Sequence, residues 1–245
     1  MSVEALHAVW LPNAANRTRA VGEDSCAADP NGPAACWTYS DAAIGFVVSG
    51  WFEYASEDQT TLAAPGSLIL GNAGEPFSVK HVDTLGNRRL VVSFKRDLLE
   101  DVANDAGVDP RFEAIALPPS QAATRMFGMI RALSQPGGED MLYPLAHAAL
   151  TTRKTRVPER ISARDRRRVQ TAVSHIEAHF GEPCTLQTLA DIAGLSRFHF
   201  VRMFGAVVGQ SPNQYVINTR MRAASDRLLA TKTPISQIAF EVGFN

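Results

Sequence analysis

Residues 184–212 read CTLQTLADIAGLSRFHFVRMFGAVVGQSP, and this stretch decides the fold of the C-terminal part of the chain. Thr185 and Ser196 are good N-caps, and each precedes a run whose apolar residues have helical spacing. Gly194 lies between the two runs and suits the left-handed conformation that ends a helix. The stretch therefore predicts a helix-turn-helix, whose second helix can enter the major groove of DNA with its first turns.

The second helix of this pair has one apolar side and one exposed side. Its spacing turns four apolar residues inward, namely Phe200, Met203, Phe204 and Val207. The candidate DNA-binding residues lie near its start, on the outward side: Ser196, Arg197, Phe198, Val201 and Arg202. Arginine can donate to guanine O6 and N7, and an aromatic ring can contact a thymine methyl group. Helical hairpins inside protein cores share the helix-glycine-helix pattern, so the pair alone leaves that alternative open.

The flanking segments are also helical. Four apolar residues at i, i+4, i+7 and i+11 predict a preceding helix: Val169, Val173, Ile176 and Phe180. Ser211 and Pro212 open a longer helix that runs to about Leu229, and a last helix follows Pro234 and ends at Gly243. Residues 165–245 are therefore predicted to form an all-α domain.

This series of helices resembles the AraC family of transcription regulators from about residue 169 to the last residue. The matching elements, in order, are Leu189-Ala190, Ala193-Gly194-Leu195-Ser196, Phe200-x-Arg202-x-Phe204, Gly209-x-Ser211-Pro212 and Ile238-Ala239-x-x-Val242-Gly243-Phe244. The resemblance implies two helix-turn-helix units that are joined by the long helix and read adjacent major-groove segments.

The sequence departs from the family pattern at two places. The family usually has a basic residue where this chain has Gly205, and the departure is expected to remove a phosphate contact. In the family a second recognition helix follows the turn at Gly243-Phe244, whereas this sequence ends at Asn245. The second unit is therefore expected to be incomplete.

The N-terminal part has the pattern of a β domain. Between Ile44 and Phe94, short apolar runs alternate with turn residues such as Pro65-Gly66, which is typical of an antiparallel barrel or sandwich. The resemblance implies a cupin-like barrel here, so the predicted fold class is α+β. The predicted domains are 1–118 for sensing or dimerisation, 119–164 as a helical linker, and 165–245 for DNA binding. Two helices, over 121–133 and 139–150, and a basic connector broken at Pro158 make up the linker.

The β domain offers a candidate effector pocket but few metal ligands. The candidate pocket residues are Phe46, Trp51, Phe77 and His81, and a plain apolar core is the alternative. A cupin-type enzyme needs several His and a Glu around a metal, whereas the strand region has only His81, with Glu53 and Glu75 near it in sequence. His175 and His179 have the spacing of a zinc pair but lack a third ligand. We therefore expect no metal, no cofactor and no enzymatic activity.

Charge separates the two halves of the chain. Residues 1–150 carry 10 Lys and Arg against 18 Asp and Glu, and residues 151–245 carry 14 against 7. A basic C-terminal half suits a polyanion, although charge balance between two packed domains would give the same numbers. There is no signal peptide or membrane-length apolar run, and the three cysteines are not closely paired, which favours a cytoplasmic protein.

The predicted partners follow from this assignment. They are double-stranded DNA, a small-molecule effector, a second copy of the chain and RNA polymerase, with no membrane partner. An activator is predicted, while the sequence itself leaves the sign of regulation open. A DNA-incompetent interaction module and a cupin-type enzyme are the alternative functions.

Overall fold

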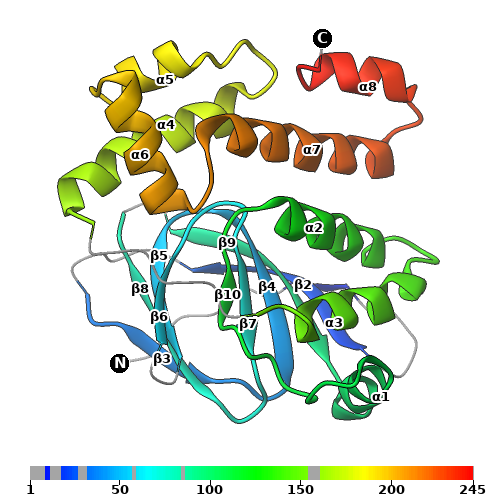
Figure 1. The fold of residues 1–245 in the computed structure, drawn as a ribbon. Helices are drawn as coiled ribbons and strands as arrows, with labels where there is room; N and C mark the ends of the chain where they lie inside the picture. Colours follow the sequence, from blue (N-terminus) through cyan, green and yellow to red (C-terminus); the bar gives the residue numbers. More distant parts are fainter. Residues whose placement is uncertain are drawn as a thin grey trace. The chain divides into compact units, whose positions relative to one another are not determined.

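The computed structural model describes residues 9–11, 18–26, 32–56, 59–83, 86–153 and 161–244, the first two ranges by their backbone alone (Figure 1). The chain divides into two compact units. Unit 1 comprises Met1–Pro118 and Arg125–Arg156, and unit 2 comprises Pro119–Thr124 and Val157–Asn245. Among the described residues, no helix is both long and apolar enough to span a membrane.

Unit 1 is built on two antiparallel sheets (Figure 1). The larger sheet has the order β1-β2-β9-β4-β7-β10, with β1 (Val9–Leu11), β2 (Thr18–Cys26), β4 (Ala42–Ser49), β7 (Leu68–Gly71), β9 (Asn87–Phe94) and β10 (Ala116–Leu117). The smaller sheet has the order β3-β8-β5-β6, with β3 (Ala35–Thr38), β5 (Phe52–Ser56), β6 (Gln59–Ala63) and β8 (Pro76–His81). All strands predicted between residues 44 and 94 are present, which confirms the antiparallel β domain.

The two sheets face each other across an apolar interior. Val47 and Ile69 of the larger sheet form one buried cluster with Phe52, Tyr54 and Val79 of the smaller sheet. Side chains alternate between the two faces of a strand, so each strand contributes every second residue to this interior. The other face of β4 packs against helix, because the rings of Phe46 and Phe127 lie 4.6 Å apart between centroids.

Unit 1 also contains α1 (Arg96–Ala106), α3 (Leu142–Leu150) and, from Arg125 onward, α2 (Gln121–Leu133). The helix predicted over 139–150 consists of a 3-10 turn, Glu139–Met141, followed by α3. Pro144 lies in the first turn of α3, where its missing N–H has no helical acceptor to lose. The break predicted at Pro158 lies outside the described residues.

From residue 161 onward, the described part of unit 2 contains five helices: α4 (Ala163–His179), α5 (Leu186–Ile192), α6 (Arg197–Val208), α7 (Pro212–Ala230) and α8 (Ile235–Glu241). Four of them start at a hydroxyl N-cap that accepts a backbone N–H three residues on, namely Ser162, Thr185, Ser196 and Ser211. The Ser162 hydroxyl accepts the N–H of Asp165, so α4 begins at Ala163, two residues before the first residue of the predicted DNA-binding domain. The helix-turn-helix and the long following helix are thus confirmed.

Candidate nucleic-acid interface and effector site

The turn between α5 and α6 sets the direction of α6. Gly194 adopts φ 63°, and its N–H donates to Asp191 O at 3.0 Å. The next N–H, of Leu195, reaches back to Ala190 O at 3.0 Å. Ser196 then starts α6, with its Oγ accepting the N–H of His199 at 3.4 Å. These contacts are local, which explains why spacing and caps predict them from sequence.

The inward side of α6 is anchored by aromatic rings. Phe200 and Phe204 are fully buried and meet edge to face, with centroids 5.5 Å apart. Phe204 also meets Tyr215 of α7 at 5.7 Å. Edge-to-face contacts of this kind add to the free energy of area burial and restrict rotation of the rings. The helix is therefore held firmly against α7 on this side.

The five predicted DNA-binding residues lie together on the opposite, exposed side of α6. All five are exposed: Ser196, Arg197, Phe198, Val201 and Arg202. Phe198 is 81% exposed, which is unusual for a phenylalanine in a well-packed helix. Neither Arg197 nor Arg202 forms an ion pair or side-chain hydrogen bond within the described part of the chain. The two guanidinium groups are therefore available to an external partner.

Gly205 lies on α6 next to this surface. A Cβ atom built there has no heavy atom within 4 Å outside the local helix backbone, so a side chain has open space. The absence of the family's basic residue at this position is therefore not imposed by packing.

A buried polar network joins α7 to α4 and was not predicted from the sequence. Oε1 of Glu177 accepts from the hydroxyl of Tyr215 at 2.7 Å, the hydroxyl of Thr219 at 3.2 Å and a guanidinium N–H of Arg222 at 2.5 Å. Burial raises the pKa of Tyr215 well above its usual value, and the Glu177 carboxylate adds to that rise. Burial alone would lower the pKa of Arg222, but Glu177 and Tyr215 together outweigh burial, and the net shift of the pKa is upward.

This network gives a structural role to Glu177, which lies between His175 and His179, the two histidines that have the spacing of a zinc pair. Glu177 points into the domain, while the rings of His175 and His179 stack on each other with centroids 4.4 Å apart. Within the described ranges, no group of three or more His, Cys, Asp or Glu side chains is placed to hold a metal ion. The expectation that the whole chain binds no metal stays a prediction.

A second contact that the sequence did not reveal is made by Arg220 of α7. Its guanidinium donates to Phe180 O at 2.8 Å and to Glu182 O at 3.0 Å, beyond the end of α4. The same group lies close to Gly243, where a Cβ atom would come within 2.9 Å of it. Arg220 therefore links three segments that are distant in the sequence: the end of α4, the middle of α7 and the turn after α8.

The structure sets one of the four predicted effector-pocket residues, Phe46, apart from Phe77 and His81. Phe77 and His81 lie on the inward face of β8, on either side of buried Val79, and Trp51 is also buried. Phe46 does not join them, because it faces α2 on the other side of its sheet. Phe77 stacks on Tyr39 at 4.2 Å and on Trp37 at 5.6 Å, so its ring is already packed.

His81 is the titratable group of this set. Burial lowers its pKa from the usual 6.5, nearby Arg89 adds to the lowering, and Asp83 opposes it. A buried imidazole with a lowered pKa is neutral at pH 7, in which form it can both donate and accept one hydrogen bond. Its role toward a ligand remains a prediction.

Comparisons with known proteins match both parts of the chain. Residues 38–148 match the AraC-like ligand binding domain, and residues 189–245 match a helix-turn-helix domain. The uncharacterized HTH-type transcriptional regulator YbfI of Bacillus subtilis is 26% identical over 216 residues, covering 82% of this chain and 76% of YbfI. The regulatory protein SoxS of Salmonella typhimurium is 30% identical over 76 residues, covering 31% of this chain and 71% of SoxS. Among solved structures, ToxT of Vibrio cholerae has a TM-score of 0.38 and 9% identity, covering 96% of this chain and 89% of ToxT.

The fold and the matches define a helix-turn-helix regulator that binds DNA and carries an N-terminal sensing domain. The chain belongs to the AraC family of transcription regulators. Its relatives are transcription regulators, which agrees with the expectation drawn from its sequence.

Proposed function

We propose that this regulator recognises a specific DNA sequence through the exposed side of α6. The observation that carries the proposal is Phe198, which is 81% exposed on a helix whose other side is fully buried. Folding supplies no reason for an aromatic ring in this position, whereas contact with a thymine methyl group does. Arg197 and Arg202 lie beside it and can donate to guanine or to phosphate.

Charge supports the same surface. Residues 151–245 carry 14 Lys and Arg against 7 Asp and Glu, and the start of α4 contributes Arg164, Arg166, Arg167 and Arg168. Cationic side chains that lie away from the base edges increase affinity without reading sequence. We assign base contacts to Arg197, Phe198, Val201 and Arg202, helix capping to Ser196, and phosphate contacts to the start of α4.

The test is selection of binding sites from a pool of random duplex DNA by the full chain, at two salt concentrations. The expected result is enrichment of a short motif. Arg202→Ala should lower the preference for the correct base at one position of this motif by about 1–3 kcal/mol. Arg167→Ala should lower affinity for all sequences and leave the motif unchanged. Arg125→Ala, on α2 of unit 1, removes the same charge and should change neither. An unchanged motif and affinity in Arg202→Ala would refute the proposal.

Unit 1 has the regulatory role in this proposal. It binds a small-molecule effector, pairs two copies of the chain, or does both, and so changes how unit 2 meets DNA and RNA polymerase. We favour activation and a non-enzymatic protein without cofactor, which acts in the cytoplasm because its target is chromosomal DNA. The boundaries 118/119 and 164/165 between sensing domain, linker and DNA-binding domain remain predictions.

A further inference from the structure

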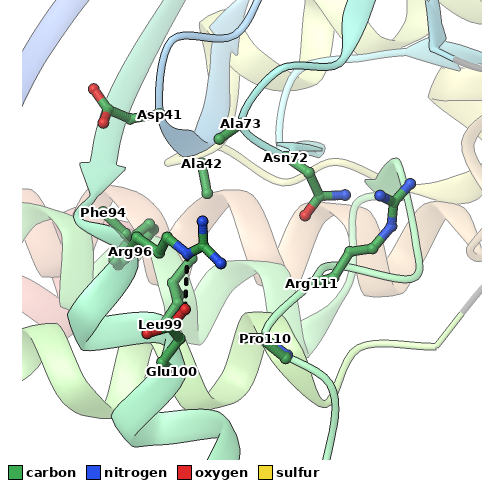
Figure 2. A pocket seen from close by; sticks show the side chains of 10 residues that line it. All are labelled: Asp41, Ala42, Asn72, Ala73, Phe94, Arg96, Leu99, Glu100, Pro110 and Arg111. Carbon is green, nitrogen blue, oxygen red and sulfur yellow. Dashed lines mark hydrogen bonds and ion pairs between the residues drawn. The ribbon is translucent and has the colours of Figure 1, made fainter.

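A pocket of about 250 Å³ opens on unit 1, away from the interior between the two sheets (Figure 2). It lies where four segments meet: the start of β4, the turn between β7 and β8, the first turn of α1, and the loop at Pro110 and Arg111. Its volume is below the usual range for sites that take drug-sized ligands, so it suits a small organic molecule.

The floor of the pocket is apolar. Phe94 is 1% exposed, Leu99 is 4% exposed and Ala42 is 6% exposed, and all three line the pocket. An apolar portion of a ligand would pack against these side chains and cover the small hydrocarbon area that they still expose. An ion with polar atoms on every side, such as phosphate, would leave this floor uncovered.

Two arginines stand on opposite walls of the pocket (Figure 2). Arg96 reaches up from α1, and its Nε donates to Glu100 at 2.7 Å. A guanidinium has five N–H donors, and the two terminal nitrogens of Arg96 have no partner among the residues that the structure describes. Arg111 forms an ion pair with Glu75.

The acidic groups near the pocket are already bound to neighbours. Glu100 accepts from Arg96, and Glu75 accepts from Arg111 and from the amide of Asn72. The remaining acid, Asp41, accepts from the Ser40 hydroxyl at 3.5 Å, and its carboxylate points away from the arginines in Figure 2. The pocket therefore offers more hydrogen-bond donors than acceptors to a ligand.

The walls are held in place without a ligand. The side-chain amide of Asn72 accepts from Phe112 N at 2.8 Å and donates to Phe112 O at 3.1 Å, which fastens the loop after α1 to the turn between β7 and β8. Phe112 in turn meets Phe94 of the floor edge to face, with centroids 6.3 Å apart. A ligand that enters such a site does not have to order its walls, which favours affinity.

We propose that this pocket binds a small carboxylate with an apolar body, such as an aromatic monocarboxylate. The carboxylate lies against the terminal N–H groups of Arg96, whose two parallel donors match its two oxygens, and the body covers Phe94, Leu99 and Ala42. The site lies outside the interior of the β domain, so the proposal goes beyond a general sensing role for unit 1.

The experiment is calorimetric titration of the full chain with benzoate, benzamide and inorganic phosphate as probes. Benzoate should bind saturably, and benzamide and phosphate should bind at least tenfold more weakly, because one lacks the charge and the other the apolar body. Arg96→Gln should weaken benzoate about tenfold. Because the side chain of Arg96 is 92% exposed, this variant is expected to fold.

Two further variants complete the test. Ala73→Phe places a ring at the exposed rim of the pocket without a change of charge, and it should weaken benzoate binding at least as much as Arg96→Gln does. Arg125→Gln, on exposed helix surface outside the pocket, should bind as the unchanged protein does. The proposal is overturned if benzoate shows no saturable binding, if benzamide or phosphate binds equally well, or if Arg96→Gln binds unchanged. Because DNA selection tests α6 separately, failure here is distinguishable from failure of the DNA-binding proposal.

Discussion

Replacement of Glu177 by alanine should destabilise unit 2 selectively. Its carboxylate accepts from Tyr215, Thr219 and Arg222, and Tyr215 is fully buried while Arg222 is 8% exposed. Without it, a buried cation loses its counter-charge and a buried hydroxyl loses its acceptor. Such losses cost about 3–5 kcal/mol in the free energy of unfolding. We expect the lower value, about 3 kcal/mol, because the Glu177 side chain is itself 28% exposed.

The chain allows the two units to be followed separately during urea unfolding. The three tryptophans, Trp10, Trp37 and Trp51, all belong to unit 1, so their fluorescence reports that unit alone. Far-UV circular dichroism follows the helices, including the five of unit 2. Glu177→Ala should lower the midpoint of the helical transition and leave the fluorescence transition in place.

Glu182→Ala is the matched control, because it removes the same carboxylate from an exposed position near the end of α4. It should change the free energy of unfolding by less than about 0.5 kcal/mol. The reasoning would be refuted if Glu177→Ala lay within about 1 kcal/mol of the unchanged protein, or if the tryptophan transition moved equally.

Three other perturbations have defined outcomes. Gly205→Lys should stabilise α6 by about 1 kcal/mol and steepen the salt dependence of DNA binding by about one phosphate contact, whereas Gly205→Ala should give the first effect alone in unfolding and binding assays. Burial lowers the pKa of His81, so below about pH 6.5 the unfolded protein binds more protons at this residue than the folded protein does. The urea concentration at the midpoint of the tryptophan-fluorescence transition should therefore decrease as the pH is lowered from about 7.5 to about 5.5, and it should decrease less in His81→Gln. At Gly243 the φ angle is 95° and an added Cβ would lie 2.9 Å from Arg220, whereas at Gly194 the φ angle is 63° and the space around an added Cβ is open. The melting temperature should therefore drop further in Gly243→Ala than in Gly194→Ala. Equal drops would contradict the Arg220 contact.

Local elements were predictable because their signals lie within a few residues of one another. Ser196 caps α6, Gly194 turns the chain, and Pro65-Gly66 separates β6 from β7, each as its neighbours indicated. Spacing also separated the buried Phe200 and Phe204 from the exposed side of α6. The series of matches to the family then joined these local features into an AraC-type helix-turn-helix region whose second unit was expected to be incomplete, since the order of the matches along the chain is specific.

Contacts between distant segments were not predictable in the same way. Phe46 is aromatic, as residues that line pockets often are, yet the pairing of β4 with β7 and β9 turns its side chain toward α2. Glu177 lies in a pattern that resembles a metal motif, yet the packing of α7 on α4 brings Arg222 and Tyr215 to it.

The sequence alone determined the class of this protein: its helices and caps, its basic C-terminal half, its β domain and the exposed side of α6 that includes Phe198 and Arg202. The tertiary structure alone decided the order of strands in two sheets, the partners of Glu177 and Arg220, and the pocket formed by segments near residues 41, 72, 96 and 111. The physical reason is that hydrogen bonds within a helix or turn join residues close in sequence. Sheet order and buried ion pairs depend instead on how distant segments meet, which no local spacing records.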